Sequence, residues 1–159
     1  MSLTSVLFVC LGNICRSPTA EAVFRVRAAA AGLDVVIASA GTGAWHIGAP
    51  PDERAQAAGL ARGYDLTSIR AQQVATSDYE KFDLLLAMDH DNLATLKSRA
   101  PKGTHARIRL FLSFAPEFGL NAVPDPYYGG DQGFEQALDL IEAASDGLVA
   151  AIRASSKDS

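Results

Sequence analysis

A strand, a tight loop and the start of a helix are predicted by the stretch Val6-Leu7-Phe8-Val9-Cys10-Leu11-Gly12-Asn13-Ile14-Cys15-Arg16-Ser17-Pro18. An uncharged apolar run that ends in Cys10 predicts a buried strand of a parallel sheet. Gly12 and Asn13 tolerate positive φ better than most residues, so the chain can curl into a tight loop after the strand. Ser17 and Pro18 then predict the cap and the first position of a helix. A strand, a curled loop and a helix start direct backbone N–H groups inward, where they can hold an anion.

The spacing of Cys10 and Arg16 indicates a nucleophile at the base of this anion site. Five residues separate them, which lets the loop close and brings the guanidinium over the oxyanion that a thiolate would attack. The loop amides, the positive end of the helix and Arg16 would all stabilise the thiolate. Arg suits this position better than Lys because its planar fork binds two phosphoryl oxygens together. The Ser17 hydroxyl could donate to the sulfur as it leaves. A lone buried Cys is usually structural, but this combination favours a phosphate cradle with a nucleophile.

Length and composition predict one folded domain over residues 1–159. A chain of 159 residues can bury an ordinary core without disulfides, and 48% hydrophobic with 20% charged residues is typical of a soluble globular protein. The net charge of −4 argues against nucleic-acid binding. We expect no membrane partner, because the sequence has no basic leader and no apolar run as long as a membrane span. Its two cysteines, five positions apart, do not form a secreted disulfide framework, so we expect a reducing, cytoplasmic compartment.

Hydrophobic periodicity predicts alternating strands and helices, which indicates an α/β fold. After the first strand, the expected strands are residues 34–39, 82–88 and 106–110. The expected helices are residues 17–31, ended by Gly32, then 51–60, and a last helix from 131 or 132 to 152, after which the tail should fray. Asp89 should cap a further helix that runs through Leu96. Residues 112–133 should be loop-like, because their prolines prevent long regular structure.

The segment Val9-Cys10-Leu11-Gly12-Asn13-Ile14-Cys15-Arg16-Ser17-Pro18 resembles the signature loop of the low-molecular-weight protein tyrosine phosphatases. The similarity continues, in the family's order, through Ala20-Glu21-Ala22-Val23-Phe24, Ser39-Ala40-Gly41, Met88-Asp89 and Asp125-Pro126-Tyr127-Tyr128-Gly129, so it covers nearly the whole chain. The resemblance implies a single-domain α/β fold with a four-stranded parallel sheet, in the order 2-1-3-4, and helices on both faces. It places the site at the carboxyl edge of the first strand.

The resemblance also implies hydrolysis of phosphotyrosine and aryl phosphates through a phosphocysteine on Cys10, without a metal or a cofactor. Arg16 and the loop would hold the phosphate; these loop residues are Leu11, Gly12, Asn13, Ile14, Cys15 and Ser17. The leaving phenol oxygen needs a proton, which a carboxylic acid on a mobile loop can supply before it deprotonates the attacking water. Asp125 is our candidate. Its Pro-Asp-Pro-Tyr-Tyr context alone predicts a turn, but it matches the family's acid loop in position.

Aromatic side chains should form the wall of the substrate pocket. We expect Trp45, Tyr127, Tyr128 and Ile14 to enclose the ring of a phosphotyrosine. Trp45 lies on a loop rich in Gly and Pro that resembles the family's variable loop, although a Trp there could instead cap the core. His46 beside it has no second histidine at metal-ligand spacing, so we expect no metal site.

Two further residues are candidates for supporting the loop. Ser39 resembles a family position that hydrogen bonds to the loop, or it is an ordinary serine at a strand end. Asp89 could support the site, although the local sequence favours a helix cap. In place of Ile69-Arg70-Ala71-Gln72 the family commonly has His-Arg-Ala-Arg, and that histidine helps to fix the loop asparagine, here Asn13. Because Ile69 cannot form this bond, we expect another group to hold Asn13.

Cys15 has two interpretations. It can pack as a small apolar residue at the start of the helix. The resemblance instead implies a reversible disulfide with Cys10, which would shield the nucleophile from overoxidation.

Three functions are candidates for this chain. The favoured one is a monomeric phosphatase that acts on phosphotyrosine-containing proteins and binds phosphate or other oxyanions. An arsenate reductase shares the scaffold but usually needs further cysteines to relay electrons, and none follows Cys15. A non-catalytic phosphate-binding or redox-sensing module would not need Cys10, Arg16 and Asp125 together.

Overall fold

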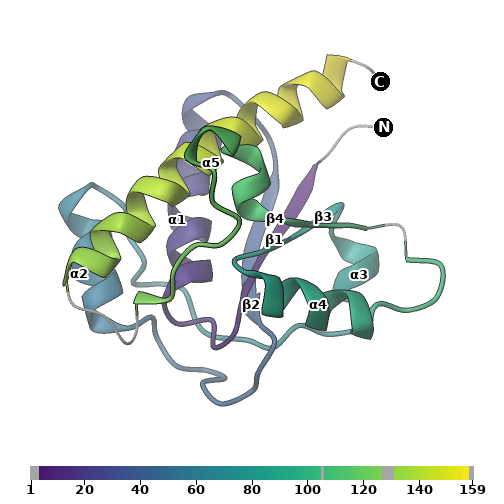
Figure 1. Cartoon of the computed structure of the whole chain (residues 1–159), viewed down its shortest axis with the longest axis horizontal. Helices are drawn as coiled ribbons and strands as arrows, with labels where there is room; N and C mark the ends of the chain where they lie inside the picture. The colour runs from purple at the N-terminus through teal and green to yellow at the C-terminus, as the bar shows by residue number, and fades with distance from the viewer. Residues whose placement is uncertain (1–3, 105, 127–130, 158–159) are drawn as a thin grey trace.

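The protein forms a parallel β-sheet with helices packed on both faces (Figure 1). The computed structural model describes residues 4–104, 106–126 and 131–157. Within these residues the sheet has four strands, all parallel, in the spatial order β2-β1-β3-β4. They are β1 (Ser5–Cys10), β2 (Val36–Gly41), β3 (Leu84–Ala87) and β4 (Arg107–Leu110). The predicted fold class and strand order are confirmed.

β1 is central because both of its faces are apolar. All six of its residues are buried, and it pairs with β2 along its whole length and with β3 over four residues. Val6 and Phe8 enter one core layer, and Leu7 and Val9 enter the other, as the alternation of side chains along a strand requires. The apolar run at the start of the sequence therefore joins the two halves of the core.

Each face of the sheet carries its own helices (Figure 1). One face carries α1 (Arg16–Ala30), α2 (Glu53–Ala61) and α5 (Asp131–Lys157); the other carries α3 (Asp78–Lys81) and α4 (His90–Arg99). Phe8 anchors the first layer through edge-to-face contacts with Phe24 and Phe111, whose ring centroids lie 5.7 and 5.0 Å away. None of the helices in the described ranges combines the length and apolar character needed to span a membrane.

Several element boundaries differ from those expected from the sequence. β2 begins and ends two residues later than expected, because it pairs with all six residues of β1. α5 continues to Lys157, so residues 154–157 are helical where fraying was expected; residues 158 and 159 lie outside the described residues. The Arg153 guanidinium donates to the Ala31 carbonyl, 3.0 Å away, and ties the last turns of the helix to the end of α1. α3 was not predicted. In and beside the expected loop region, the described residues include the short 3₁₀ helices η1 (Phe111–Phe114) and η2 (Pro116–Phe118).

The start of α1 corrects one prediction. The helix begins at Arg16 with Cys15 in the N-cap position, and no side chain caps it. Ser17 is therefore not the cap, and Pro18 is the third helical residue. The Ser17 hydroxyl cannot cap the helix because it lies between the Cys10 sulfur and the Asn13 amide.

α5 passes very close to η1 at a glycine. A Cβ added to Gly147 would overlap the carbonyl oxygen of Phe114. Only a residue without a side chain permits this approach, which seats α5 directly on the segment that follows β4.

Gly147→Ala should destabilise the protein by about 2 kcal/mol, because overlap of the new Cβ with backbone outweighs the gain in helix propensity. Gly133→Ala on the same helix is the matched control: the atoms nearest to its Cβ are 3.6 Å away, on Pro126, so this change should be neutral or stabilising. Denaturant unfolding measures both free energies. Equal effects of the two substitutions would contradict the proposed contact.

Candidate active site

Cys10 lies at the carboxyl end of β1, where the β1–α1 loop (residues 11–15) begins, and its side chain is buried. The backbone N–H of Asn13 donates to the Cys10 Sγ, at a distance of 3.3 Å. The Ser17 Oγ lies 2.9 Å from the same sulfur. The Ser17 Oγ accepts a hydrogen bond from the Asn13 Nδ2, at 2.8 Å, and its proton lies within reach of both the Cys10 sulfur and the Ala40 carbonyl, the latter at 3.4 Å. The Asn13 N–H therefore donates to the sulfur, and the Ser17 hydroxyl is a second group that can do so when the sulfur carries negative charge.

Asn13 shapes the loop. Among the described residues other than glycine, it is the one with positive φ, at 57°. Besides its bond to Ser17, the Asn13 Nδ2 donates to the Ser39 Oγ at 3.0 Å, and the Asn13 Oδ1 accepts from the Gln72 backbone N–H at 3.0 Å. The backbone N–H of Gln72 is thus a group that holds the Asn13 side chain by a hydrogen bond, which the apolar side chain of Ile69 cannot form. Ile69 itself packs against the core.

A buried acidic residue extends this network to the surface of the protein. The Ser39 hydroxyl donates to the Glu21 Oε1 at 2.7 Å, and the other oxygen of Glu21 forms an ion pair with Arg25 at 2.6 Å. Ser39 therefore connects the loop to α1 instead of being an ordinary serine at a strand end. The role of Glu21 was missed by the sequence analysis; its spacing from Arg25, one helical turn, was the available signal.

The end of β2 fixes the backbone of the loop. The N–H groups of Thr42 and Gly43 donate to the carbonyls of Cys10 and Leu11, each at 2.9 Å. A Cβ at Gly41 would lie 2.7 Å from the Leu11 carbonyl oxygen, so the loop packs directly against backbone there. The loop is therefore braced along β2 as well as through Asn13.

Arg16 is almost completely buried, and its guanidinium is held on one side. Its Nη1 donates to the Asp89 Oδ2 at 2.7 Å and to the Val123 carbonyl at 3.0 Å. The Asp89 Oδ1 accepts from the Asn92 N–H at 2.8 Å, so Asp89 both caps α4 and orients Arg16. The contact with Val123 could not be foreseen, because it uses a backbone carbonyl 107 positions away.

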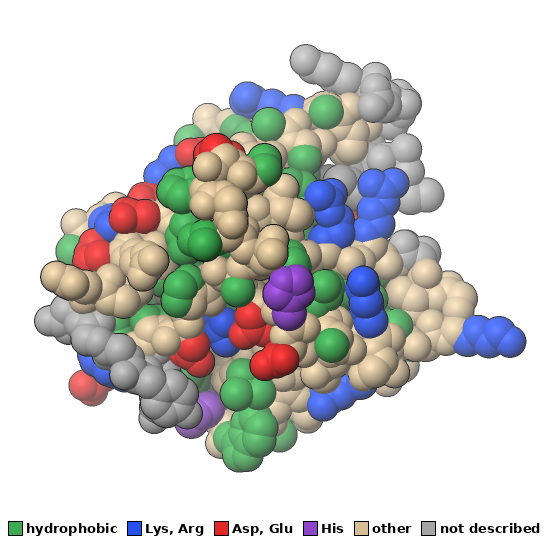
Figure 2. All heavy atoms as spheres, viewed as in Figure 1, with side chains coloured by type: hydrophobic (Ala, Val, Ile, Leu, Met, Phe, Trp, Pro, Cys, Tyr) green, Lys and Arg blue, Asp and Glu red, His purple; other side chains and the backbone are tan. Residues whose placement is uncertain are grey.

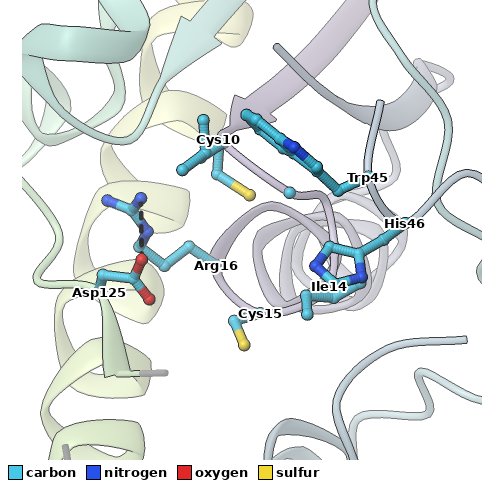
Figure 3. Close-up of a pocket in the computed structure, with 9 residues that line it drawn as sticks. Cys10, Ile14, Cys15, Arg16, Trp45, His46 and Asp125 are labelled. Carbon is cyan, nitrogen blue, oxygen red and sulfur yellow. Dashed lines mark ion pairs between the residues drawn. The ribbon is translucent and has the colours of Figure 1, made fainter. Parts of the chain in front are cut away.

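Asp125 faces the second side of the guanidinium. Its Oδ2 lies 3.6 Å from the Arg16 Nη2, and the N–H of Val123 donates to the Met88 carbonyl at 2.8 Å, which ties this segment to the end of β3. In Figure 3 Asp125 and Arg16 lie together on one side of the pocket, while Trp45, His46 and Ile14 lie on the other. Tyr127 and Tyr128, expected in the pocket wall, lie outside the described residues.

These side chains line a pocket of about 440 Å³. The Cys10 sulfur and Arg16 lie at its base, and Ile14, Trp45, His46 and Asp125 are among its walls. Trp45 is 73% exposed, so it does not cap the core. His46 was considered only as a metal ligand, and its place in the wall was missed. The carboxyl ends of β1 and β2 point to the lower part of Figure 1, where Figure 2 shows acidic and hydrophobic side chains side by side.

Cys15 also lines the pocket but belongs to the hydrophobic core. Burial, reinforced by the carboxylates of Asp52 and Asp125, raises the pKa of the Cys15 thiol to about 12. Cys15 is therefore almost entirely a neutral thiol near pH 7. Both cysteines are free thiols in the structure.

The arrangement is suited to nucleophilic substitution at the central atom of an oxyanion, such as the phosphorus of a phosphate ester. It combines a sulfur that accepts a hydrogen bond from the Asn13 N–H, a guanidinium whose orientation is fixed by Asp89, and a carboxyl group at the pocket wall. These groups can attack, bind and protonate parts of one small ligand. Two of the predicted site residues lie behind the pocket: Ser39 holds the loop through Asn13, and Asp89 holds the guanidinium of Arg16.

Comparison with known proteins identifies the family of the chain. The family model for low molecular weight phosphotyrosine protein phosphatase matches residues 5–158. A low molecular weight protein-tyrosine-phosphatase of Streptomyces coelicolor is 48% identical over 153 residues, 93% of each chain. The structure of a protein tyrosine phosphatase from Entamoeba histolytica, with Hepes in the active site, matches with 39% identity and a TM-score of 0.90 over 94% of this chain and 97% of that one. Vibrio vulnificus Wzb, in complex with benzylphosphonate, matches with 30% identity and a TM-score of 0.83 over 94% and 99%. The chain therefore belongs to the low molecular weight phosphotyrosine protein phosphatase family.

Proposed function

We propose that this protein hydrolyses phosphotyrosine in proteins, and small aryl phosphates, through a phosphocysteine on Cys10. The observation that carries the proposal is the convergence of Cys10, Arg16 and Asp125 on one pocket, with Ser17 at the sulfur. Family membership supports the same activity. Cys10 is the proposed nucleophile, Arg16 the phosphate-binding residue and Asp125 the general acid and base.

In the first step, the phosphate dianion binds against the loop N–H groups and the Arg16 Nη2. The Cys10 thiolate attacks phosphorus, and the bond from phosphorus to the phenol oxygen breaks as the S–P bond forms. The carboxylic acid of Asp125 donates its proton to the leaving oxygen. Because Asp89 and the Val123 carbonyl already hold Nη1, Arg16 needs little reorganisation to bind the charge that develops on the phosphoryl oxygens.

In the second step, water attacks the phosphorus of the phosphocysteine. The Asp125 carboxylate takes a proton from this water, and the S–P bond breaks to release phosphate. The Ser17 hydroxyl, 2.9 Å from the sulfur, stabilises the departing thiolate. The Arg16 guanidinium and the loop amides neutralise the phosphoryl charge, so the cycle closes without a metal or a cofactor.

The pocket walls favour an aromatic ester. Trp45 and Ile14 can contact a phenyl ring while its phosphate lies at the base of the pocket. Benzylphosphonate bound to the Wzb relative pairs a ring with such an oxyanion. Tyr127 and Tyr128 remain proposed additions to this wall.

We also infer the setting of the enzyme. A single domain over residues 1–159, acting as a monomer on phosphoproteins in the cytoplasm, fits the small size, the net charge of −4 and the two reduced cysteines. The same charge disfavours nucleic acid as a partner, and we propose no membrane partner.

Cys15 is a proposed redox partner of Cys10. Peroxide would oxidise the Cys10 thiolate to a sulfenic acid; attack by the Cys15 sulfur would then form the disulfide and release water, and an external dithiol would restore both thiols. The proposal is supported by the place of both residues in one pocket. The high pKa of Cys15, about 12, keeps it from competing with Cys10 as a nucleophile.

Cys10→Ser should lower kcat for aryl phosphates more than about a thousandfold, because an alcohol is far less acidic than a thiol. Hydrolysis is measured with a metal chelator present, and circular dichroism checks that the variant is folded. Mass spectrometry of acid-quenched wild-type enzyme should find phosphate on the peptide that contains Cys10. Substantial activity of the variant, or loss of wild-type activity with the chelator, would overturn the mechanism.

Asp125→Asn should lower kcat for phosphotyrosine by about a hundredfold to a thousandfold, because the tyrosine phenolate is a poor leaving group unless it receives a proton. The loss should be smaller for a nitrophenyl phosphate, whose leaving group needs less protonation. Asp146→Asn is the matched control, since Asp146 also pairs with an arginine, Arg27, but on the surface of α5. Equal losses for both leaving groups would contradict the role of Asp125 as the acid.

After treatment with peroxide and then with dithiothreitol, Cys15→Ala should recover at least about twofold less activity than wild type. Without Cys15, the Cys10 sulfenic acid is not trapped as a disulfide and proceeds to irreversible oxidation states. Each recovery is divided by the activity of the same variant before oxidation. Equal recoveries, or no Cys10–Cys15 peptide in mass spectra of the oxidised wild type, would exclude the disulfide.

A further inference from the structure

A second pocket adjoins the active site across Trp45. Its volume is about 570 Å³, and it shares Leu11 and Trp45 with the pocket that contains Cys10. Thr42, Gln73, Thr95 and Arg99 complete its polar lining. A substrate that is longer than phosphotyrosine itself can therefore leave the first pocket over Trp45 and enter the second.

The backbone holds Trp45 in this dividing position. The indole ring lies over Gly43, where an added Cβ would overlap it, and the N–H of Gly43 is bound to the Leu11 carbonyl at 2.9 Å. Leu11 and Trp45 are 47% and 73% exposed. They form an apolar ridge between the two pockets, over which an extended peptide can pack.

Arg99 is the charged residue in the lining of the second pocket. Its Nη1 donates to the Thr42 carbonyl at 2.7 Å, which holds the guanidinium at the pocket. Within residues 4–104, 106–126 and 131–157, no ion pair with Arg99 is found. Thr95, one turn earlier on α4, places a hydroxyl on the same face of the helix.

The carboxylates on the opposite side of the active-site mouth are paired with arginines. The Asp52 Oδ1 lies 3.2 Å from the Arg54 Nε, and the Asp125 Oδ2 lies 3.6 Å from the Arg16 Nη2. Arg99, by contrast, has no carboxylate partner among the described residues, so a carboxylate on a substrate would be attracted toward it.

We propose that the second pocket is a specificity subsite that binds an acidic side chain near the phosphotyrosine in a substrate protein, with Arg99 as its ion-pairing residue. This inference rests on the proposed function and specifies the class of substrate: proteins that carry an acidic side chain near the phosphotyrosine. A Glu or Asp carboxylate pairs with the Arg99 guanidinium, whose planar fork suits two oxygens, while the phosphotyrosine ring occupies the first pocket. The pair contributes to substrate binding and lies away from the reacting atoms, so its effect falls on KM.

The test uses phosphotyrosine peptides that carry one Glu at successive positions on either side of the phosphotyrosine, each matched by a peptide with Gln. For every variant, kcat/KM is divided by the value for an aryl phosphate, which is too short to reach Arg99. At the best position, wild type should prefer Glu over Gln by about threefold to fivefold, and the preference should decrease as salt rises.

Arg99→Gln should abolish this preference, and Arg99→Lys should retain part of it. Arg153→Gln is the matched control, because it removes the same charge and a similar guanidinium-to-carbonyl bond, to Ala31, far from the pocket; it should keep the full preference. A wild-type enzyme that hydrolyses the aryl phosphate but prefers Glu at no position, or an Arg99→Gln enzyme that keeps the preference, would overturn the subsite. Failure of wild type to hydrolyse the aryl phosphate would overturn the proposed function itself.

Discussion

Asn13 adopts φ of 57°, and hydrogen bonds of its side-chain amide to Ser17, Ser39 and the Gln72 N–H hold it there. A left-handed backbone is costly for most residues, and Asn is one of the few that tolerate it. Because the amide is buried, losing any partner would leave a polar group unsatisfied. The curl directs the Asn13 N–H at the Cys10 sulfur. The geometry of the proposed nucleophile thus depends on the bonds of one side chain.

Arg16 imposes a second constraint, from the other side of β1. A buried guanidinium needs a partner, and Asp89 at the end of β3 supplies it. Through the Val123 carbonyl, the same guanidinium also holds the segment that carries Asp125. The loop is therefore braced toward β2 by Asn13 and toward β3 by Arg16. This position, at the carboxyl edge of a central strand with neighbours on both sides, is where ligands bind in open α/β sheets.

Local sequence signals were sufficient for features that depend on neighbouring residues. The apolar run before Cys10 forms the central strand, Gly32 follows the end of α1, and Asp89 caps α4. The same signals were misleading at Ser17, a good capping residue whose hydroxyl is used by Cys10 and Asn13 instead. The role of Gln72 had no signal at all, because its backbone N–H, common to all residues except proline, forms the bond.

The sequence alone determined the fold class and, through family resemblance, the strand order. It also led to the proposed nucleophile, Cys10, the proposed phosphate-binding residue, Arg16, and the proposed acid, Asp125. Each of these depends on residue types at short spacings or on motifs in a fixed order. Only the tertiary structure decided what holds Asn13, what Asp89 does besides capping, and that His46 and Arg99 line adjoining pockets. These contacts join residues far apart in the chain, and many of them use backbone atoms. Their partners are set by how the strands and helices pack, which no local pattern specifies.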